Sequence, residues 1–313
     1  MGTKAPLQLL IFGSWLVAFG AAALLEYAPN ASLWFPPAAV TFAAVMVLGL
    51  RALPVLWLGC LVVTLLADQI YQRGLAWPEL LLAGLAFAIT HTLAYAAVAL
   101  VLRSRDDVLS PGAYRGNVTL FLMGGMLATG LSSALGGLSL AATGMTEFRE
   151  LPALIPTWWI GDYAGLVTVA PLFAVLLTQL AEALEVTPRK RLEPLLGPRP
   201  WHALWPGAAL KLLGLAALTL TILAIAVVFA APFVLVLLLL ACLPVQLWIA
   251  RNESPLVTLL GVFGFTLLLA IATSATGLRE QAPTLQFMVI SVAIGSYLDL
   301  AADRRTERDT ARP

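Results

Sequence analysis

Charged side chains are scarce in this sequence. Asp, Glu, Lys and Arg make up 11% of its 313 residues, hydrophobic residues make up 60%, and the formal net charge is +1. A water-soluble domain of this length needs a more charged surface, because charged residues almost always stay in contact with solvent. The composition therefore excludes an ordinary soluble protein. We expect a lipid bilayer as its surroundings and no nucleic-acid partner.

Cysteine and histidine, which build many metal and catalytic sites, are also scarce, with two of each. Cys60 and Cys242 both lie in apolar runs, where we expect buried thiols and no disulfide framework. The sequence has no Cys/His metal spacing, no nucleophile–base pair and no phosphate-binding glycine loop. We therefore predict no catalytic residues, no metal, no cofactor and no enzymatic activity.

Long apolar runs are abundant instead. Most are about 20 residues long or longer, enough to cross a hydrocarbon core of about 30 Å, and the second is shorter. We predict an all-α, polytopic integral membrane bundle of about ten transmembrane helices, and we interpret the first run as uncleaved because further spans follow at once. The expected helices are 6–26, 37–50, 52–71, 77–102, 117–142, 155–180, 208–230, 232–250, 254–276 and 283–301.

The basic residues are distributed unevenly over the loops of this ten-helix arrangement. With the N-terminus inside, only Arg73, Arg149 and Arg279 of the 18 lysines and arginines fall on the outer side. Cytoplasmic loops are enriched in Lys and Arg, so this asymmetry favours an even helix number with both termini cytoplasmic.

The domain organisation follows from the same pattern. We expect residues 1–302 to form one integral membrane domain and residues 303–313 to form a charged cytoplasmic tail, with no output domain. The longest inner loop, about 181–207, is rich in proline, which prevents a long helix. We interpret it as a connector at the membrane surface.

An aspartate at the edge of a hydrophobic span is the main candidate for a functional residue. Asp162 follows Trp158, Trp159 and Gly161 and precedes Gly165. It lies about 20 residues before Glu182, a helical rise of about 30 Å. If Glu182 marks the inner face, Asp162 lies at the outer edge of the hydrocarbon, and residues 151–161 form an outer segment or half-helix that leads into the span. An acid there is costly and indicates a ligand site, although a helix start can also stabilise an acid and tryptophans also anchor membrane interfaces.

Other acids gather on the same outer side. Asp68 is expected at a depth similar to that of Asp162, and Trp34 lies in the first outer loop. A shared outward-facing pocket lined by acids and tryptophans would suit a cationic or hydrogen-bonding ligand. Alternatively, the remaining outer acids are solvated loop residues that pair with the three outer arginines.

His91 is the deepest titratable residue. It lies about 18 Å of helical rise from both Glu79 and Arg103, close to the middle of the bilayer, and Tyr95 is one turn further on. Either it is a neutral histidine satisfied by a neighbouring hydroxyl group, or it acts as a proton-sensitive switch.

Two blocks of sequence carry a family resemblance. The first is Leu-Trp-Phe-Pro-Pro-Ala at 33–38, followed by Gly-Leu-Arg at 49–51, and the second is Trp-Trp-Ile-Gly-Asp-Tyr-Ala-Gly at 158–165. Over nearly its whole length the chain resembles the first type of bacterial membrane-associated sensor domain, the MASE group. The resemblance implies a multi-pass sensory module of the bacterial inner (plasma) membrane, usually found in front of a histidine kinase, a diguanylate cyclase or phosphodiesterase, or a phosphatase domain. The positions that match the family motif are Asp162, Gly161, Gly165, Trp159, Trp34 and Pro36.

This sequence departs from the family at Asp68, where a small or amide residue is expected, and in the expected lack of an output domain. Our leading hypothesis is a signal-transduction receptor that detects a small ligand or membrane state through the outer pocket. It would pass the signal through the last helix to a cytoplasmic partner or a homodimer. A small-molecule transporter is the alternative, and the small-residue face of the fifth helix also allows a structural partner role.

Overall fold

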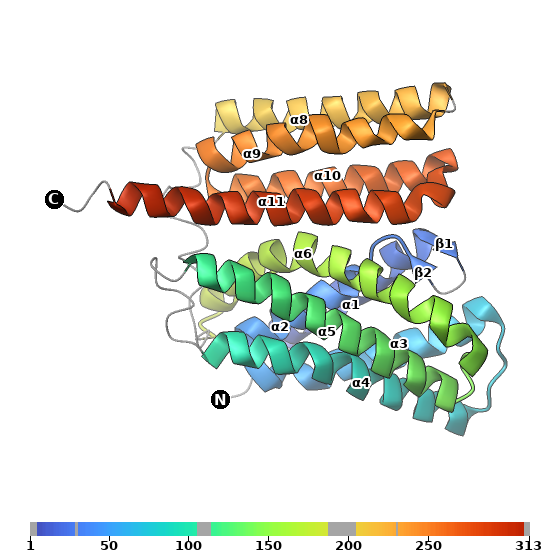
Figure 1. Ribbon diagram of the computed structural model, residues 1–313. Helices are drawn as coiled ribbons and strands as arrows, with labels where there is room; N and C mark the ends of the chain where they lie inside the picture. The colour runs from blue at the N-terminus through green and yellow to red at the C-terminus, as the bar shows by residue number, and fades with distance from the viewer. Residues whose placement is uncertain (1–4, 29–30, 105–113, 187–204, 230, 310–313) are drawn as a thin grey trace.

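The computed structural model describes residues 5–28, 31–104, 114–186, 205–229 and 231–309, and most of them are helical (Figure 1). Backbone polar groups find no partners in hydrocarbon, so apolar runs of this kind form helices. The all-α prediction is confirmed. The long elements are α1 (Ala5–Leu24), α2 (Pro36–Leu48), α3 (Leu53–Tyr71), α4 (Trp77–Ser104), α5 (Tyr114–Ala142), α6 (Leu151–Ala183), α8 (Trp205–Val228), α9 (Leu243–Asn252), α10 (Pro255–Thr276) and α11 (Ala282–Asp309).

Short elements join or extend these helices. A small antiparallel pair of strands between α1 and α2 is one feature that the sequence patterns do not predict. The short elements are β1 (Glu26–Ala28), β2 (Ala31–Ser32), the 3₁₀ helices η1 (Gly49–Ala52), η3 (Phe148–Glu150), η5 (Pro232–Leu235) and η7 (Leu278–Gln281), and the π-helical turn η6 (Leu238–Cys242).

Within the described ranges, nine helical stretches are long and apolar enough to cross a membrane. One of them, Pro36–Tyr71, is 36 residues long and contains α2, η1 and α3. The ten-helix prediction has two separate helices here, so the two counts differ only in how this stretch is divided.

The chain reverses its direction inside that stretch, at η1. The side chain of Gln8 at the start of α1 donates to the Arg51 carbonyl oxygen over 3.3 Å, whereas Tyr71 at the end of α3 donates to Glu26, just beyond the end of α1. α3 therefore runs alongside α1 in the same direction, and α2, which precedes η1, runs in the opposite direction. Gly49, at φ 68°, takes a left-handed conformation that a residue with a side chain rarely adopts.

α6 is one continuous helix of 33 residues, with Pro156 and Pro171 inside it. Residues 151–161, expected as a separate outer half-helix, are its first turns. Asp162 consequently lies about three turns inside the helix. Since the helix dipole acts within the first turn, it does not explain the position of this acid.

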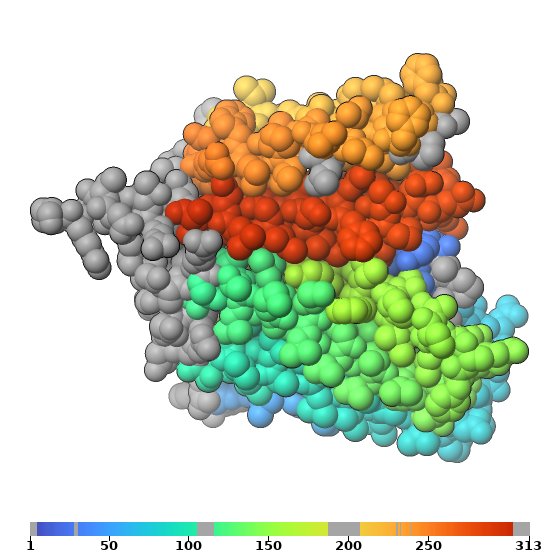
Figure 2. Space-filling view, viewed as in Figure 1, coloured from blue at the N-terminus to red at the C-terminus, as the bar shows by residue number. Residues whose placement is uncertain are grey.

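The helices form two packed groups. One core is formed mostly by α1 to α6, with buried residues of α9, α10 and α11 at its edge, and a second is formed mostly by α8 to α11. α10 and α11 pack against α6 at the seam between the groups, and Figure 2 shows α11 lying between α5–α6 on one side and α8–α9 on the other. α11 is therefore in contact with helices of both groups.

Two of the expected segments lie partly outside the described residues. These are the connector 181–207, of which 187–204 are not described, and the tail 303–313, of which 310–313 are not described. The backbone of α11 continues to Asp309, so it extends into the expected tail.

Candidate ligand pocket

A pocket of about 120 Å³ lies inside the six-helix group, at the end where the β1–β2 pair is found. Every element around it contributes to its wall. The residues that represent α1, β2, α3, α4, α5 and α6 are Phe19, Ser32, Thr64, His91, Ser132 and Asp162. The pocket therefore depends on the packing of the whole group and not on any one sequence motif.

Asp162 lines this pocket from α6. Its side chain is only 6% exposed, and the Tyr95 hydroxyl donates to its Oδ2 atom over 2.7 Å. No donor in the described part of the chain reaches its other carboxyl oxygen, Oδ1. A buried carboxyl group is costly unless its oxygens are paired. Asp162 thus keeps one acceptor open toward the pocket.

His91 forms part of the same wall and is 1% exposed. Its Nδ1 atom lies 3.1 Å from Ser132 Oγ and its Nε2 atom lies 3.4 Å from Thr41 Oγ1, so both ring nitrogens face hydroxyl groups. Aromatic rings enclose it, with the ring centroids of Phe87 and Tyr95 at 5.2 and 4.9 Å. The arrangement holds the imidazole in one orientation.

The two motif blocks contact each other directly behind the pocket. The Phe35 amide donates to the Gly161 carbonyl oxygen over 3.1 Å. A Cβ atom at Gly165 would lie 2.2 Å from the Phe35 carbonyl oxygen, and one at Gly161 would lie 2.7 Å from that of Ser32. Only glycine allows the backbone before α2 to lie this close to α6.

The other residues of the motif hold this contact in place. Trp34 is buried, and its Nε1 atom donates to Thr168 Oγ1 in α6 over 2.9 Å. Pro36 starts α2 at its first position, where its missing N–H is tolerated. Trp34, Pro36 and Gly165 therefore position the wall of the pocket without lining it.

The two adjacent tryptophans have different surroundings. Trp158 lines the pocket, whereas Trp159 donates from Nε1 to the Met126 carbonyl oxygen over 2.9 Å and packs against Gly130 of α5. Neighbouring residues on a helix point about 100° apart, so only one of them faces the pocket.

Asp68 lies outside the pocket. It is 3% exposed and accepts from the Leu75 amide over 3.2 Å and from the Gln69 side chain over 3.4 Å. These bonds close the turn between α3 and α4, where Gln72 takes a left-handed conformation. The structure therefore does not bring Asp68 and Asp162 into a shared pocket.

Two lining residues, Glu26 and Tyr71, are not among the site residues predicted from the sequence. Tyr71 donates a hydrogen bond to Glu26, and both side chains line the pocket. Burial raises the pKa of Glu26, and the Tyr71 hydrogen bond opposes part of that rise. The sequence leaves open whether the outer acids line a pocket or are solvated in loops, and the structure places Glu26, the first residue of β1, in the pocket wall.

The back of the pocket also contacts α11. The buried side chain of Gln286 donates to the carbonyl oxygens of Leu33 over 3.1 Å and Ser32 over 3.4 Å. Further along the seam, the Tyr297 hydroxyl donates to the Val167 carbonyl oxygen over 2.6 Å. The backbone at Ser32 and Leu33 is thereby hydrogen-bonded to α11.

Comparisons of this chain with protein-family models, with curated proteins and with solved structures find no match. The family resemblance therefore stays a prediction from the sequence, based on the two motif blocks and the number of helices. The two blocks contact each other directly, and both contribute to or support the wall of the same pocket.

Proposed function

We propose that this protein is a sensory module of the bacterial inner membrane that binds a small ligand in the pocket beside Asp162. One observation carries the proposal: the backbone that forms the pocket wall at Ser32 is hydrogen-bonded to Gln286 of α11. A ligand that displaces this wall must also change the hydrogen bonds that hold α11 against it. It shifts the equilibrium only as far as it binds one arrangement better than the other.

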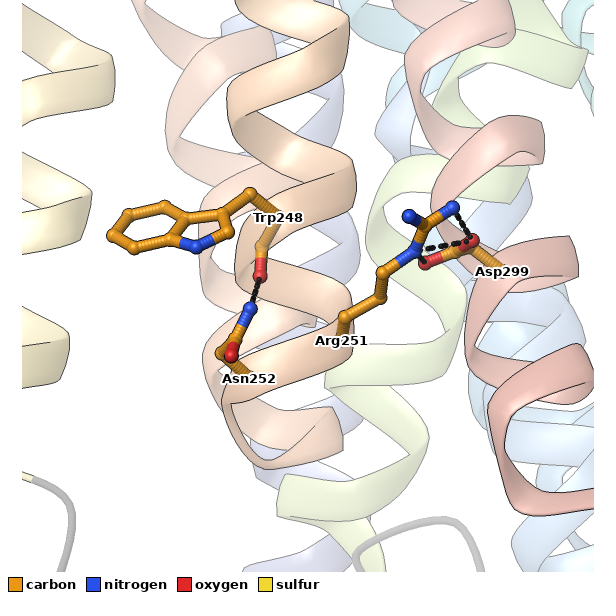
Figure 3. Close-up of polar contacts among 4 residues, drawn as sticks. All are labelled: Trp248, Arg251, Asn252 and Asp299. Atoms are coloured by element: carbon orange, nitrogen blue, oxygen red, sulfur yellow. Dashed lines mark hydrogen bonds and ion pairs between the residues drawn. The ribbon is translucent and has the colours of Figure 1, made fainter. Parts of the chain in front are cut away.

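The opposite end of α11 is tied to α9. The Arg251 guanidinium makes three bonds of 2.8 to 3.0 Å to the Asp299 carboxylate, and Asn252 donates to the Trp248 carbonyl oxygen beside it (Figure 3). A displacement of α11 along its axis must carry α9 with it or break this pair. The signal would leave at this end, toward a cytoplasmic output domain, a separate signalling partner or a second copy of the chain.

The proposed topology has ten crossings with both termini in the cytoplasm. The reversal at η1 supports it, because α2 and α3 then count as two crossings. α2 has 13 residues, a rise of about 20 Å, so it would reach across only part of the bilayer. The placement of all basic residues except Arg73, Arg149 and Arg279 on one side is consistent with this orientation.

A reporter fusion tests the proposal. The full chain is joined at its C-terminus to a diguanylate cyclase domain, and cyclase output is compared between the wild type, Asp162→Asn and Gln286→Leu. We expect both substitutions to change the output, the first through the ligand and the second through the link to α11. Asp68→Asn is the control, because this acid is equally buried but lies outside the pocket. Unchanged output in both variants would refute the proposal.

A transporter remains the alternative, and one observation favours it. Asp162, Tyr95, Ser132 and His91 form a chain of buried polar side chains, in which Tyr95 is hydrogen-bonded to Asp162 and Ser132 lies 3.1 Å from His91 Nδ1. Chains of this kind carry protons in membrane transporters. Proton flux into proteoliposomes under an imposed membrane potential, abolished by His91→Ala, would favour transport over sensing.

A further inference from the structure

We propose that the pocket beside Asp162 binds a small organic ammonium ion. The inference deepens the proposed function, since it names the chemical class of ligand for the same pocket. Three properties of the pocket lead to it: its charge, the state of its hydrogen-bonding groups, and its aromatic lining.

The charge of the lining is of one sign. Two carboxylic acids, Asp162 and Glu26, contribute to the wall, and among the described residues that line it none is lysine or arginine. Anionic ligands normally need a cationic side chain or a cluster of backbone N–H groups. A cation supplies the charge that this lining lacks, and it turns a buried acid into a paired one.

The hydrogen-bond donors around the pocket are already in use. Ser32 donates to the Trp34 carbonyl oxygen over 2.9 Å, Thr64 to the Cys60 carbonyl oxygen over 2.9 Å, and Tyr71 to Glu26. Thr146 likewise donates to Glu150 over 2.5 Å.

The open group at the base of the pocket is instead an acceptor, Asp162 Oδ1, since Tyr95 occupies the other oxygen. A complementary ligand therefore brings N–H donors of its own. An ammonium group does so and carries the matching charge, which makes the hydrogen bond stronger than one between neutral groups.

Aromatic rings make up much of the remaining wall. Phe19, Phe35, Phe87 and Trp158 all line the pocket, each from a different segment. The faces of such rings attract cations, and aromatic cages are a recurrent site for ammonium ligands. The same rings accept the hydrocarbon part of the ligand.

The volume limits the size of the ligand. The pocket measures about 120 Å³, somewhat less than a cavity of about 150 Å³ that holds one benzene molecule. A ligand of roughly six non-hydrogen atoms fits this space. Short-chain or single-ring amines are of this size, whereas peptides and nucleotides are far larger.

Calorimetric titration of the full chain in nanodiscs tests the charge requirement with three ligands of similar shape: isopentylammonium, isopentanol and isovalerate. We expect isopentylammonium to bind at least about tenfold more tightly than isopentanol, since only the ammonium makes a charge-assisted bond to Asp162. Isovalerate should not bind. In Asp162→Asn the preference for the ammonium over the alcohol should disappear, and in Asp68→Asn it should persist.

The ratio of two dissociation constants within one variant is insensitive to a loss of folded protein, so partial misfolding of Asp162→Asn does not obscure the result. Equal binding of the alcohol, tighter binding of the carboxylate, a preference that survives Asp162→Asn, or no binding of the ammonium would each overturn the proposal. If isopentanol binds as tightly as isopentylammonium, and the pocket-filling change Ala67→Leu abolishes this binding, then the proposal of an ammonium ligand is wrong. The same result would show that the pocket itself binds small molecules. The sensor proposal itself is judged by the reporter output of Asp162→Asn and Gln286→Leu.

Discussion

Replacing Gly165 with alanine tests the contact between the two motif blocks. The new Cβ atom would lie 2.2 Å from the Phe35 carbonyl oxygen, 2.5 Å from its carbonyl carbon and 3.0 Å from the Pro36 nitrogen. All three are backbone atoms, so no side-chain rotation relieves the clash. Reaching an ordinary contact of 3.4 Å requires the Phe35 carbonyl oxygen to move by about 1.2 Å.

The energetic cost follows from this displacement. A shift of that size breaks the bond from the Phe35 amide to the Gly161 carbonyl oxygen, now 3.1 Å, at a cost of about 1 kcal/mol. Overpacking a well-packed core costs about 1–3 kcal/mol more. Alanine returns up to about 1 kcal/mol through its higher helix propensity. We therefore expect Gly165→Ala to lower the free energy of unfolding by about 2 kcal/mol.

Reversible unfolding in mixed micelles, followed by tryptophan fluorescence, measures this change. Gly161→Ala should cost less, because its Cβ atom would lie 2.7 Å from the Ser32 carbonyl oxygen. Gly264→Ala is the matched control: a Cβ atom there has no neighbour within 4 Å among the described residues, so stability should stay the same or rise slightly. If Gly165→Ala unfolds like the Gly264→Ala control, the close approach of the two blocks is not as described.

Three further predictions concern the pocket wall, the link between α9 and α11, and Glu26. Trp34→Phe removes the donor to Thr168 Oγ1 and should cost about 1–2 kcal/mol of unfolding free energy in the same assay, whereas an unchanged value would mean that this bond contributes nothing. Arg251→Ala should change the free energy of unfolding by less than about 1 kcal/mol, since the Arg251 side chain is 62% exposed. It should nevertheless alter the reporter output. A large loss of stability with normal output would contradict its role in linking α9 to α11. Burial raises the pKa of Glu26, so its charged form is disfavoured in the folded state. The resulting destabilisation is absent at low pH. It grows as the pH rises above the pKa of about 4.3 in the unfolded chain and through the higher pKa in the folded protein. Glu26→Gln should flatten this part of the pH–stability profile, and an identical profile in the variant would show that Glu26 is not buried.

The helices are largely predictable because a long apolar run leaves the backbone few alternatives in a bilayer. The boundaries of α3, Leu53–Tyr71, differ from the expected 52–71 by one residue at one end. The start of α6 is less well predicted. The expected helix begins at 155, whereas α6 already begins at Leu151.

The candidate site is only partly predictable. Asp162 is recognisable from sequence because an acid in an apolar run is unusual. Its hydroxyl partner Tyr95 comes from α4, and the neighbours of His91 come from α2 and α5. Contacts between residues so far apart in the chain depend on how the helices pack, which periodicity within one helix does not report.

Depth in the bilayer and position in a pocket are separate quantities, and Asp68 illustrates the difference. Helical rise places it near the level of Asp162, but rise contains no information about which neighbours its side chain meets. The two tryptophans make the same point, since Trp158 faces the pocket and Trp159 faces α5.

Local chemistry in the sequence thus determined which segments are helical, which of their ends carry the basic residues, and which acid is out of place. The tertiary structure alone decided that 31–36 rests on α6, that Glu26 lines the pocket, and that Gln286 connects the wall to α11. The physical reason is that apolar burial drives helices together without direction, whereas the few polar groups and the glycines at the contacts select one arrangement among many.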